Sequence, residues 1–270
     1  MRGLWLLSGM LLACGPGPNP ETRLTELRVI QIVAEPPEVA PGELSIATVT
    51  VVDPEERGVE VLTWTCTDLG DGCLEAELPL ELWTRVQSPV DEQVEHIVGV
   101  PGELAPLLEE IPALPTTVYA LACEPGLCPV IDDIVRGRAT GTELTDVDAL
   151  MRGLPITGVS LASRFVFLSS AAPEERNANP VATPDFLEER LISDADSLKL
   201  RFVVDDDTDV VAYGLADAGG FSMPAEDVVD GAVECEWFAP KNQRQTRLYV
   251  AFEDGEGGAA LWRGTVTLPE

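Results

Sequence analysis

The sequence is poor in the side chains on which most catalytic and metal sites depend. Among its 270 residues, histidine occurs once, at His96, and lysine twice, at Lys199 and Lys241. Histidine is the usual general base and a common zinc ligand, and lysine forms Schiff bases. The sequence also lacks a phosphate loop ending in Gly-Lys-Ser or Gly-Lys-Thr, a His-Glu-x-x-His motif and a Gly-x-Ser-x-Gly elbow. It therefore predicts a protein that is not an enzyme.

Positive charge is equally scarce. Lys and Arg together number 17 against 47 Asp and Glu, which gives a formal net charge of -30. A surface with this charge repels the phosphate backbone of nucleic acids. Nucleic acid is therefore excluded as a partner, while 45% hydrophobic residues are enough for a packed globular core.

Long hydrophobic runs are absent as well. The only apolar run at the N-terminus, Leu4 to Ala13, follows Arg2 and is about half of the roughly 20 residues that a membrane-spanning helix needs. A charged start, a short apolar stretch and a small residue before the break are typical of a secretory signal. Residues 1–13 are therefore predicted to be a signal peptide, and no later segment is predicted to cross a membrane.

The end of this signal, Leu11-Leu12-Ala13-Cys14-Gly15, resembles the lipobox of bacterial lipoproteins. The resemblance implies that Cys14 is the lipidation site, and that several acyl chains hold the mature protein on the membrane. Gly15, in place of an aspartate, implies sorting to the outer membrane. An ordinary signal peptide with a chance cysteine is the alternative. Residues 14–26, rich in proline and glycine, are predicted to be a semi-extended tether.

Short runs of β-branched and aromatic residues between turn signals predict a mainly β protein with little helix. In the first half, Leu62, Trp64 and Cys66 alternate along one strand and are predicted to face the core, with Trp64 as its central aromatic. An exposed tryptophan would instead allow carbohydrate stacking. Strands are expected at Leu27–Ala34, Leu44–Val52, Val59–Cys66, Leu80–Val86, Val94–Val98 and Thr116–Cys123.

A change of composition near Pro129 marks a linker, residues 131–156, that separates a first domain at 27–130 from a second at 157–270. Thr145 and Gly153 have the residue types that cap the start and end of a helix, so one short helix is expected between them. Trp237 is predicted to be the core aromatic of the second domain. Its strands are expected at Thr157–Ser169, Leu198–Val204, Val210–Leu215, Glu234–Phe238, Thr246–Phe252 and Ala260–Leu268, the last two as a hairpin around Asp254-Gly255-Glu256-Gly257-Gly258.

The chain resembles uncharacterised surface lipoproteins of the myxobacterial type, which carry tandem immunoglobulin-like domains. The resemblance is carried by the lipobox at Cys14 together with turn and strand patterns spread over most of the chain. It implies two immunoglobulin-like β-sandwiches in tandem and no assigned activity. The patterns are Ala34–Gly42, Thr63-Trp64-Thr65-Cys66, Leu154–Leu161, Asn177-Ala178-Asn179-Pro180 and the hairpin glycines after Asp254.

Five cysteines remain after Cys14, in a compartment where disulfides form. If Cys66 and Cys123 end neighbouring antiparallel strands, as in an immunoglobulin-like sheet, they lie about 17 Å apart, too far for a bond. Two local disulfides are therefore predicted, Cys66 with Cys73 and Cys123 with Cys128. Cys235 is left over and is expected to be a buried thiol.

Asp205-Asp206-Asp207-Thr208-Asp209 gathers four carboxylates in one predicted turn. A solvated acidic turn is the favoured interpretation, because aspartate is common in turns and the spacing is not that of a calcium loop with a glycine at its sixth position. A calcium site is the alternative. Its ligands would be Asp205, Asp207 and Asp209, because alternate residues of an extended segment point the same way.

Together these patterns predict a lipid-anchored protein of the outer membrane that works as a non-enzymatic binding or scaffold module, with a protein or a glycan as its partner. The membrane is a partner through the lipid alone, and no cofactor is expected apart from the covalent lipid and the alternative calcium. A structural spacer of an envelope assembly is the second hypothesis. A secreted-side enzyme with an acidic site is the third, because so many carboxylates make chance pairs inevitable.

Overall fold

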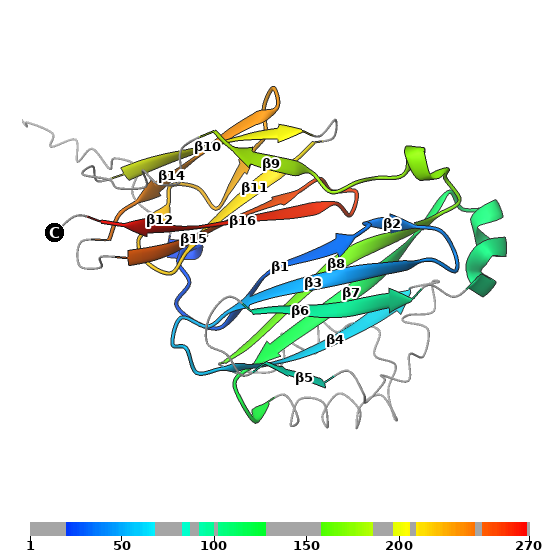
Figure 1. Ribbon diagram of the computed structural model, residues 1–270, viewed down its shortest axis with the longest axis horizontal. Helices are drawn as coiled ribbons and strands as arrows, with labels where there is room; N and C mark the ends of the chain where they lie inside the picture. Colours follow the sequence, from blue (N-terminus) through cyan, green and yellow to red (C-terminus); the bar gives the residue numbers. More distant parts are fainter. Residues whose placement is uncertain are drawn as a thin grey trace, which may run out of the picture.

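The computed structural model shows a mainly β protein built from two β-sandwiches (Figure 1). It describes residues 20–67, 83–86, 92–99, 102–127, 158–185, 197–205, 209–240 and 245–268. The signal peptide, Cys14 and the helix expected between Thr145 and Gly153 lie outside these ranges.

The first sandwich consists of a three-stranded and a five-stranded sheet, in the orders β1-β3-β6 and β2-β8-β7-β4-β5. All neighbouring strands are antiparallel except β2 and β8, which are parallel. The bounds are β1 Arg28–Glu35, β2 Glu38–Val39, β3 Leu44–Val52, β4 Val59–Thr67, β5 Trp83–Val86, β6 Glu92–Gly99, β7 Ala113–Cys123 and β8 Val159–Ser169, with short 3₁₀ helices η1 at Pro20–Thr22 and η3 at Gly102–Glu109.

Alternation along these strands places one apolar face of each sheet against the other. Val49 and Val98 from the smaller sheet and Val61, Val118 and Val166 from the larger one are all at most 1% exposed and belong to one apolar cluster. Fully burying a valine side chain stabilises a fold by about 1.5–3 kcal/mol before entropy is counted. This cluster is the core of the first sandwich.

The strand order makes this sandwich immunoglobulin-like. In that fold the first, second and fifth strands form one sheet, and the third, sixth and seventh form the other. Here β1, β3 and β6 make the first set, while β4, β7 and β8 make the second, with β5 at the edge. The short β2 leaves the first sheet and joins β8 in the second.

The strand expected at Thr157–Ser169 forms, as β8, but it does not open the second domain. It pairs with β7 over its whole length, from Val159 opposite Cys123 to Ser169 opposite Ala113. The first sandwich therefore extends to Ser169, and the predicted boundary at residue 157 is wrong. The reason is that the last strand of this sandwich comes after the long stretch that composition marked as a linker.

The second sandwich pairs a sheet of order β12-β14-β10-β9 with one of order β13-β11-β15-β16, again an immunoglobulin-like arrangement. Its core contains Leu200, Phe202, Trp237, Phe252 and Trp262, with Phe202 making edge-on contacts to the rings of Phe252 and Trp262. The bounds are η4 Pro173–Glu175, β9 Val181–Pro184, β10 Ser197–Asp205, β11 Val211–Ala216, β12 Gly220–Phe221, β13 Ala225–Asp227, β14 Ala232–Phe238, β15 Gln245–Glu253 and β16 Ala259–Thr267.

Trp237 is the core aromatic of the second sandwich, as predicted. Its side chain is fully buried, and its indole N–H donates a hydrogen bond to the carbonyl oxygen of Ala218 at 3.1 Å. The next residue, Gly219, has φ +71, and a Cβ there would lie 2.1 Å from the carbonyl oxygen of Phe238. Only glycine fits this turn over the tryptophan.

The core face predicted for the third strand is wrong. Val59 and Val61 of β4 point into the core, whereas Leu62, Trp64 and Cys66 lie on the opposite face. Trp64 is therefore not a core aromatic. It is half-buried on the outer face of the larger sheet, where its ring stacks on that of Tyr119 with centroids 5.1 Å apart and 12° between the planes. Trp64 also packs against a small apolar cluster on this face, which includes Leu62 and Leu121.

Cys66 and Cys123 lie at opposite ends of the β4–β7 pair. Cys66 is opposite Thr117, six positions before Cys123, which corresponds to about 20 Å at the usual strand rise. Each of the two is disulfide-bonded, and Cys235 is a free, buried thiol. They cannot bond to each other across that distance. Their partners are therefore among Cys14, Cys73 and Cys128, which lie outside the described residues, and the two local pairings stay a prediction.

We expect the oxidised mature protein to contain one free thiol after denaturation, that of Cys235. Proteolysis without reduction should release one peptide pair that links Cys66 to Cys73 and another that links Cys123 to Cys128, identified by mass spectrometry. Each short ring should stabilise the fold by at most about 3 kcal/mol on the chain-entropy estimate. A peptide that joins Cys66 to Cys128 would show that the pairing is wrong.

Candidate functional site

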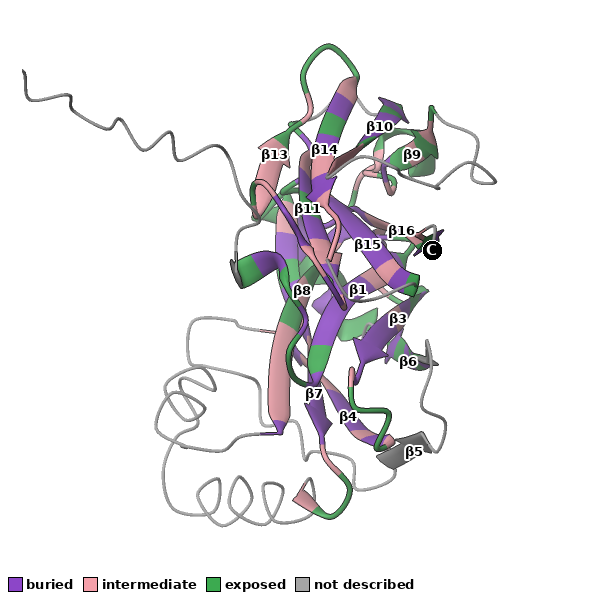
Figure 2. Cartoon of the chain, turned by 90° about the vertical axis from the view of Figure 1, so that its left-hand side faces the viewer, coloured by how far each residue is buried: buried purple, intermediate pink, exposed green. Residues whose placement is uncertain are grey.

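The two sandwiches pack directly against each other. The outer face of the first domain's smaller sheet contributes Ile30 of β1 and Val52 of β3, which form one apolar cluster with Tyr249 of β15. Leu24, which precedes β1, belongs to the same cluster, and the partly buried Leu215 and Leu261 pack against it. The tether predicted for residues 14–26 is therefore wrong at Leu24, which is packed and hydrogen-bonded to Ala216 of the second domain. The strand β1 is buried along most of its length (Figure 2). This apolar contact is the first component of the domain junction.

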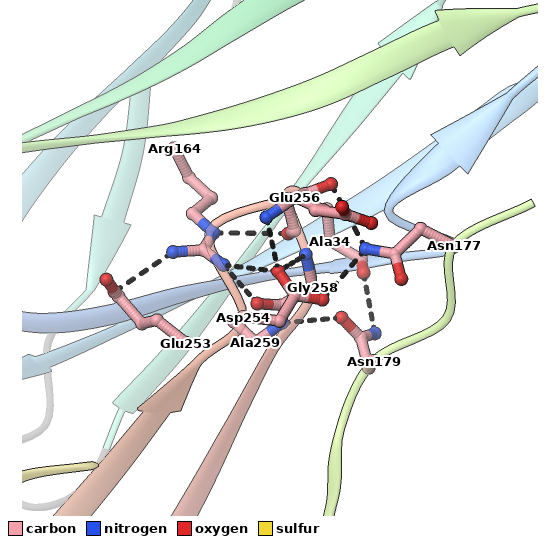
Figure 3. A network of polar contacts seen from close by, with 10 residues as sticks. Ala34, Arg164, Asn177, Asn179, Glu253, Asp254, Glu256, Gly258 and Ala259 are labelled. Carbon is pink, nitrogen blue, oxygen red and sulfur yellow. Dashed lines mark hydrogen bonds and ion pairs between the residues drawn. The ribbon is translucent and has the colours of Figure 1, made fainter. Parts of the chain in front are cut away.

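A polar network forms the second component of the domain junction (Figure 3). It is centred on Asp254, at the start of the turn between β15 and β16, whose side chain is fully buried. One carboxylate oxygen, Oδ1, accepts hydrogen bonds from the backbone N–H groups of Glu256 and Gly258, both at 2.8 Å. An aspartate that closes its own turn in this way fixes the shape of the hairpin.

Arg164 of β8 reaches this hairpin from the first domain. Its guanidinium donates hydrogen bonds to the carbonyl oxygens of Gly257 and Gly258, and it forms an ion pair with Glu253 at 3.1 Å. Its distance to the carboxylate of Asp254 is 3.8 Å. The arginine side chain is only 10% exposed, so its charge is withdrawn from water and is compensated by these acceptors.

Two asparagines of the segment between β8 and β9 complete the domain junction. The side-chain amide of Asn177 donates to Asp254 at 2.8 Å, and its backbone N–H donates to Glu38 of the first domain at 2.6 Å. The amide of Asn179 donates to the carbonyl oxygen of Ala34 at 2.8 Å. Its Oδ1 accepts from the backbone N–H of Ala259 at 2.8 Å. One asparagine thus links β1 of the first domain to β16 of the second.

Two glycines of this hairpin are required because the hairpin backbone lies very close to neighbouring backbone and ring atoms. Gly257 has φ +99, and a Cβ there would lie 3.2 Å from the carbonyl oxygen of Phe165 and 2.9 Å from the ring of Phe167. A Cβ on Gly258 would lie 2.8 Å from the carbonyl oxygen of Ala178. The hairpin therefore touches the first domain through its backbone, which leaves little freedom for the two sandwiches to move relative to each other.

The sequence predicted the hairpin and contained the motif Asn177-Ala178-Asn179-Pro180, but it did not predict that the hairpin and this motif are in contact. Turn residues such as Asp254 and Asn177 are common in any loop, and Arg164 lies 90 positions before Asp254 along the chain. A turn aspartate together with three nearby glycines was the only sequence signal for a close backbone contact.

His96 is buried inside the first sandwich. It points from β6 toward β4, where its ring nitrogens share hydrogen bonds with the hydroxyl groups of Thr63 at 3.0 Å and Thr65 at 3.2 Å. Burial lowers the pKa of this histidine, because the charged imidazolium loses hydration in the core. Both nitrogens are engaged, so the ring is a structural group that spans the two sheets.

Of the predicted calcium ligands, Asp205 ends β10 and Asp209 precedes β11, whereas Asp207 lies outside the described residues. Within the described ranges no group of three or more His, Cys, Asp or Glu residues is close enough to hold a metal ion. The remaining cysteine, Cys235, is buried in the second core, and desolvation raises the pKa of its thiol to about 12. The side chain therefore stays protonated and unreactive.

One apolar surface stays open beside the domain junction. Leu44 and Ile46 of β3 and Ile97 of β6 are 61%, 45% and 64% exposed, on the outer face of the smaller sheet. Ile46 and Ile97 are direct cross-strand partners. We call these three residues the β3–β6 apolar face. It is the second candidate functional feature. The sequence did not predict it, because alternation alone does not show which outer faces of the sheets stay uncovered.

A comparison with protein-family models found no match, and neither did a search of the curated proteins. Among solved structures, the chain is similar to the D0-D1 domains of intimin, with 9% identity, 88% of this chain and 98% of that chain covered, and a TM-score of 0.26. It is also similar to the Yersinia pseudotuberculosis adhesin InvE, with 12% identity, 92% and 61% covered, and a TM-score of 0.24. The immunoglobulin-like assignment rests on the strand order described above.

In the part of the chain that the structure describes, no helix has both the length and the apolar character to cross a bilayer.

Replacing Asp254 with alanine should loosen the domain junction. The substitution leaves the N–H groups of Glu256 and Gly258 without their acceptor and removes a counter-charge from Arg164, at a cost of about 3 kcal/mol. Scanning calorimetry should show one unfolding transition for the wild type and two separate transitions for Asp254→Ala. Asp185→Ala removes an exposed aspartate paired with the exposed Arg201 and should leave the profile unchanged. A single, unshifted transition in Asp254→Ala would contradict this role.

The buried His96 predicts a specific dependence of stability on pH. Its pKa is lower in the folded than in the unfolded state, so its contribution is complete above about pH 6.5 and declines as the pH falls toward the folded pKa. The slope is at most about 1.4 kcal/mol per pH unit. Urea unfolding between pH 7 and pH 5 should show this loss in the wild type and a flatter profile in His96→Gln. Equal slopes in both proteins would contradict the assignment.

Proposed function

We propose that this protein is a cell-envelope lipoprotein that acts as a non-enzymatic binding or scaffold module. The observation that carries the proposal is the domain junction, in which Arg164, Asp254 and Asn179 join the two sandwiches into one body. Modules that present surfaces in a fixed geometry gain from such preorganisation, because little motional freedom is lost on binding. A simple chain of sandwiches has no need for a buried arginine between them.

The β3–β6 apolar face supports the binding role. Single exposed apolar residues are ordinary on protein surfaces, but a contiguous group of them indicates an interaction site. Ile46 and Ile97 are adjacent across two strands, so their side chains form a continuous surface with Leu44 beside it. A protein partner is favoured over a glycan, because these side chains are aliphatic, whereas sugar rings stack on aromatic ones.

The proposed anchor is the lipid on Cys14, with the proline-rich residues that follow as a tether. The support comes from the sequence, in which a cysteine follows a short apolar run at the position that the lipobox motif requires. The outer membrane is the proposed destination, since glycine and not aspartate follows the cysteine. An anchor of this kind leaves both sandwiches free to face an envelope partner.

A spacer is the second candidate function, and the same domain junction favours it, since a rigid pair of domains sets a fixed distance from the membrane. The two functions differ in their dependence on the β3–β6 apolar face. A spacer tolerates polar substitutions at Ile46 and Ile97, whereas a binding module loses its partner. The acidic-site enzyme has no comparable observation in its favour.

Cys14→Ser should release the protein from the membrane without unfolding it. The expected cause is loss of the acyl chains, because the substitution leaves unchanged Thr22 and Leu24, the buried residues through which the N-terminal segment packs on the second domain. Cells that express the wild type, Cys14→Ser or Cys235→Ala are fractionated, and the protein is detected by immunoblotting. The wild type and Cys235→Ala should remain with membranes, while Cys14→Ser appears in the soluble fraction. Membrane association of Cys14→Ser would contradict the lipid anchor.

We further propose that the loop between Asp205 and Asp209 is a solvated acidic turn, with calcium as the alternative. If solvent and salt relieve the carboxylate repulsion, NaCl and CaCl₂ at matched ionic strength should raise the melting temperature equally. A specific calcium site would add about 2.7 kcal/mol at a hundredfold excess over Kd. A calcium-specific rise in the melting temperature that disappears in Asp207→Asn would contradict the solvated turn. It would favour a calcium site formed by Asp205, Asp207 and Asp209.

A further inference from the structure

We infer that the β3–β6 apolar face binds an extended segment of a basic partner protein, which adds as a strand along the edge of β6 that has no partner among the described strands. The inference deepens the proposed binding role and rests on it. The bound segment is extended and basic, and its site is the β3–β6 apolar face. Apolar side chains on one side of the segment would lie beside Ile97, which is itself paired with Ile46, and flanking lysines or arginines would meet the acidic surface around them.

The β3–β6 apolar face continues a sheet face that the domain junction already covers in part. Along the outer face of β3, one end is covered and the other is exposed: Val52 is 2% and Thr50 is 1% exposed, whereas Ile46 is 45% and Leu44 61% exposed. Val52 packs with Tyr249 in the domain junction. One half of this sheet face is therefore already an established interface, and the β3–β6 apolar face is its uncovered continuation.

Among the described strands, β6 forms an edge of its sheet. The strand β6 bonds to β3 on one side, and among the described strands it has no neighbour on the other. In the second sandwich the equivalent strand, β14, lies between β10 and the short β12. Edge strands with unpaired peptide groups accept an added strand, and here the edge runs directly beside the exposed Ile97.

The charge of the protein favours a basic partner. The protein carries a formal net charge of -30, so two copies repel each other and a basic partner is attracted. Locally, the exposed Glu95 lies on β6 opposite Thr48, and the exposed Glu35, whose carboxylate also accepts a hydrogen bond from Asn179 at 2.6 Å, lies opposite Ile46. Both carboxylates belong to the same outer face as Ile97. A segment with apolar residues at alternate positions and cationic flanks fits this face better than a second copy of the chain.

The probe for the test is a fluorescein-labelled peptide with an alternating Thr-Val core and a pair of lysines at each end. Its controls have the same core with glutamate flanks, or the lysine flanks with alternate backbone amides N-methylated. The oxidised mature protein should bind the lysine probe at least about tenfold more tightly than either control, measured by fluorescence anisotropy. Hydrogen exchange should slow in β6 when the lysine probe is bound.

The matched variants are Ile46→Thr with Ile97→Thr, and as a control Val181→Thr with Val229→Thr, which replaces exposed valines of the second domain. Threonine keeps the branched shape suited to a strand. The first pair should weaken binding about tenfold, and the second should leave it unchanged. Circular dichroism and melting temperature confirm that each variant is folded.

Several outcomes would overturn the inference. Equal binding to all variants, or to the N-methylated peptide, would show charge attraction without strand addition. No binding of the lysine probe would show that the edge does not accept an added strand. Slow exchange in β6 before any probe is added would show that another segment of this chain, or a second copy, covers the face. The Cys14→Ser fractionation is a separate measurement, so failure here is distinguishable from failure of the proposed anchor.

Discussion

The arrangement of the whole molecule depends on one buried charged contact, in which Arg164 of the first sandwich holds the β15–β16 hairpin of the second. The hairpin accepts this guanidinium because Asp254 is buried within the turn and leaves the carbonyl oxygens of Gly257 and Gly258 directed toward it. A buried charge is costly unless it is paired and hydrogen-bonded. Such a contact therefore favours one geometry and penalises small displacements, and the apolar cluster around Tyr249 supplies the area that stabilises it.

The same contact determines which surfaces remain available. By placing the second domain over one half of the outer face of β3, it covers Val52 and leaves Ile46 and Leu44 open to a partner. It also fixes the direction in which that open half points relative to the rest of the protein. The function that we propose follows from this arrangement: a fixed pair of sandwiches, on a lipid tether, presents one apolar and acidic surface.

Much of the fold was predictable, because alternation identifies strands wherever one face is buried and the other is not. The long strands from β1 to β16 were predicted in this way, and Trp237 was placed correctly. Alternation could not identify the core face of β4, because both faces of this strand carry apolar residues. A period of two does not show whether Val61 or Leu62 faces the core. Strands of two to four residues, such as β9 and β12, carry too little pattern. The domain junction could not be predicted, because its residues are ordinary turn and strand types brought together only by the tertiary fold.

The measurement that tests this account most directly is the alignment of the two domains in solution. Residual dipolar couplings of backbone amides, recorded for the mature protein in a weakly aligning medium, give an alignment tensor for each sandwich. We predict tensors of the same magnitude and orientation in the frame of the structure described here, because the domain junction makes the two domains one rigid body. Tensors that differ in magnitude would show that the sandwiches move independently, and would contradict the central role of Arg164 and Asp254.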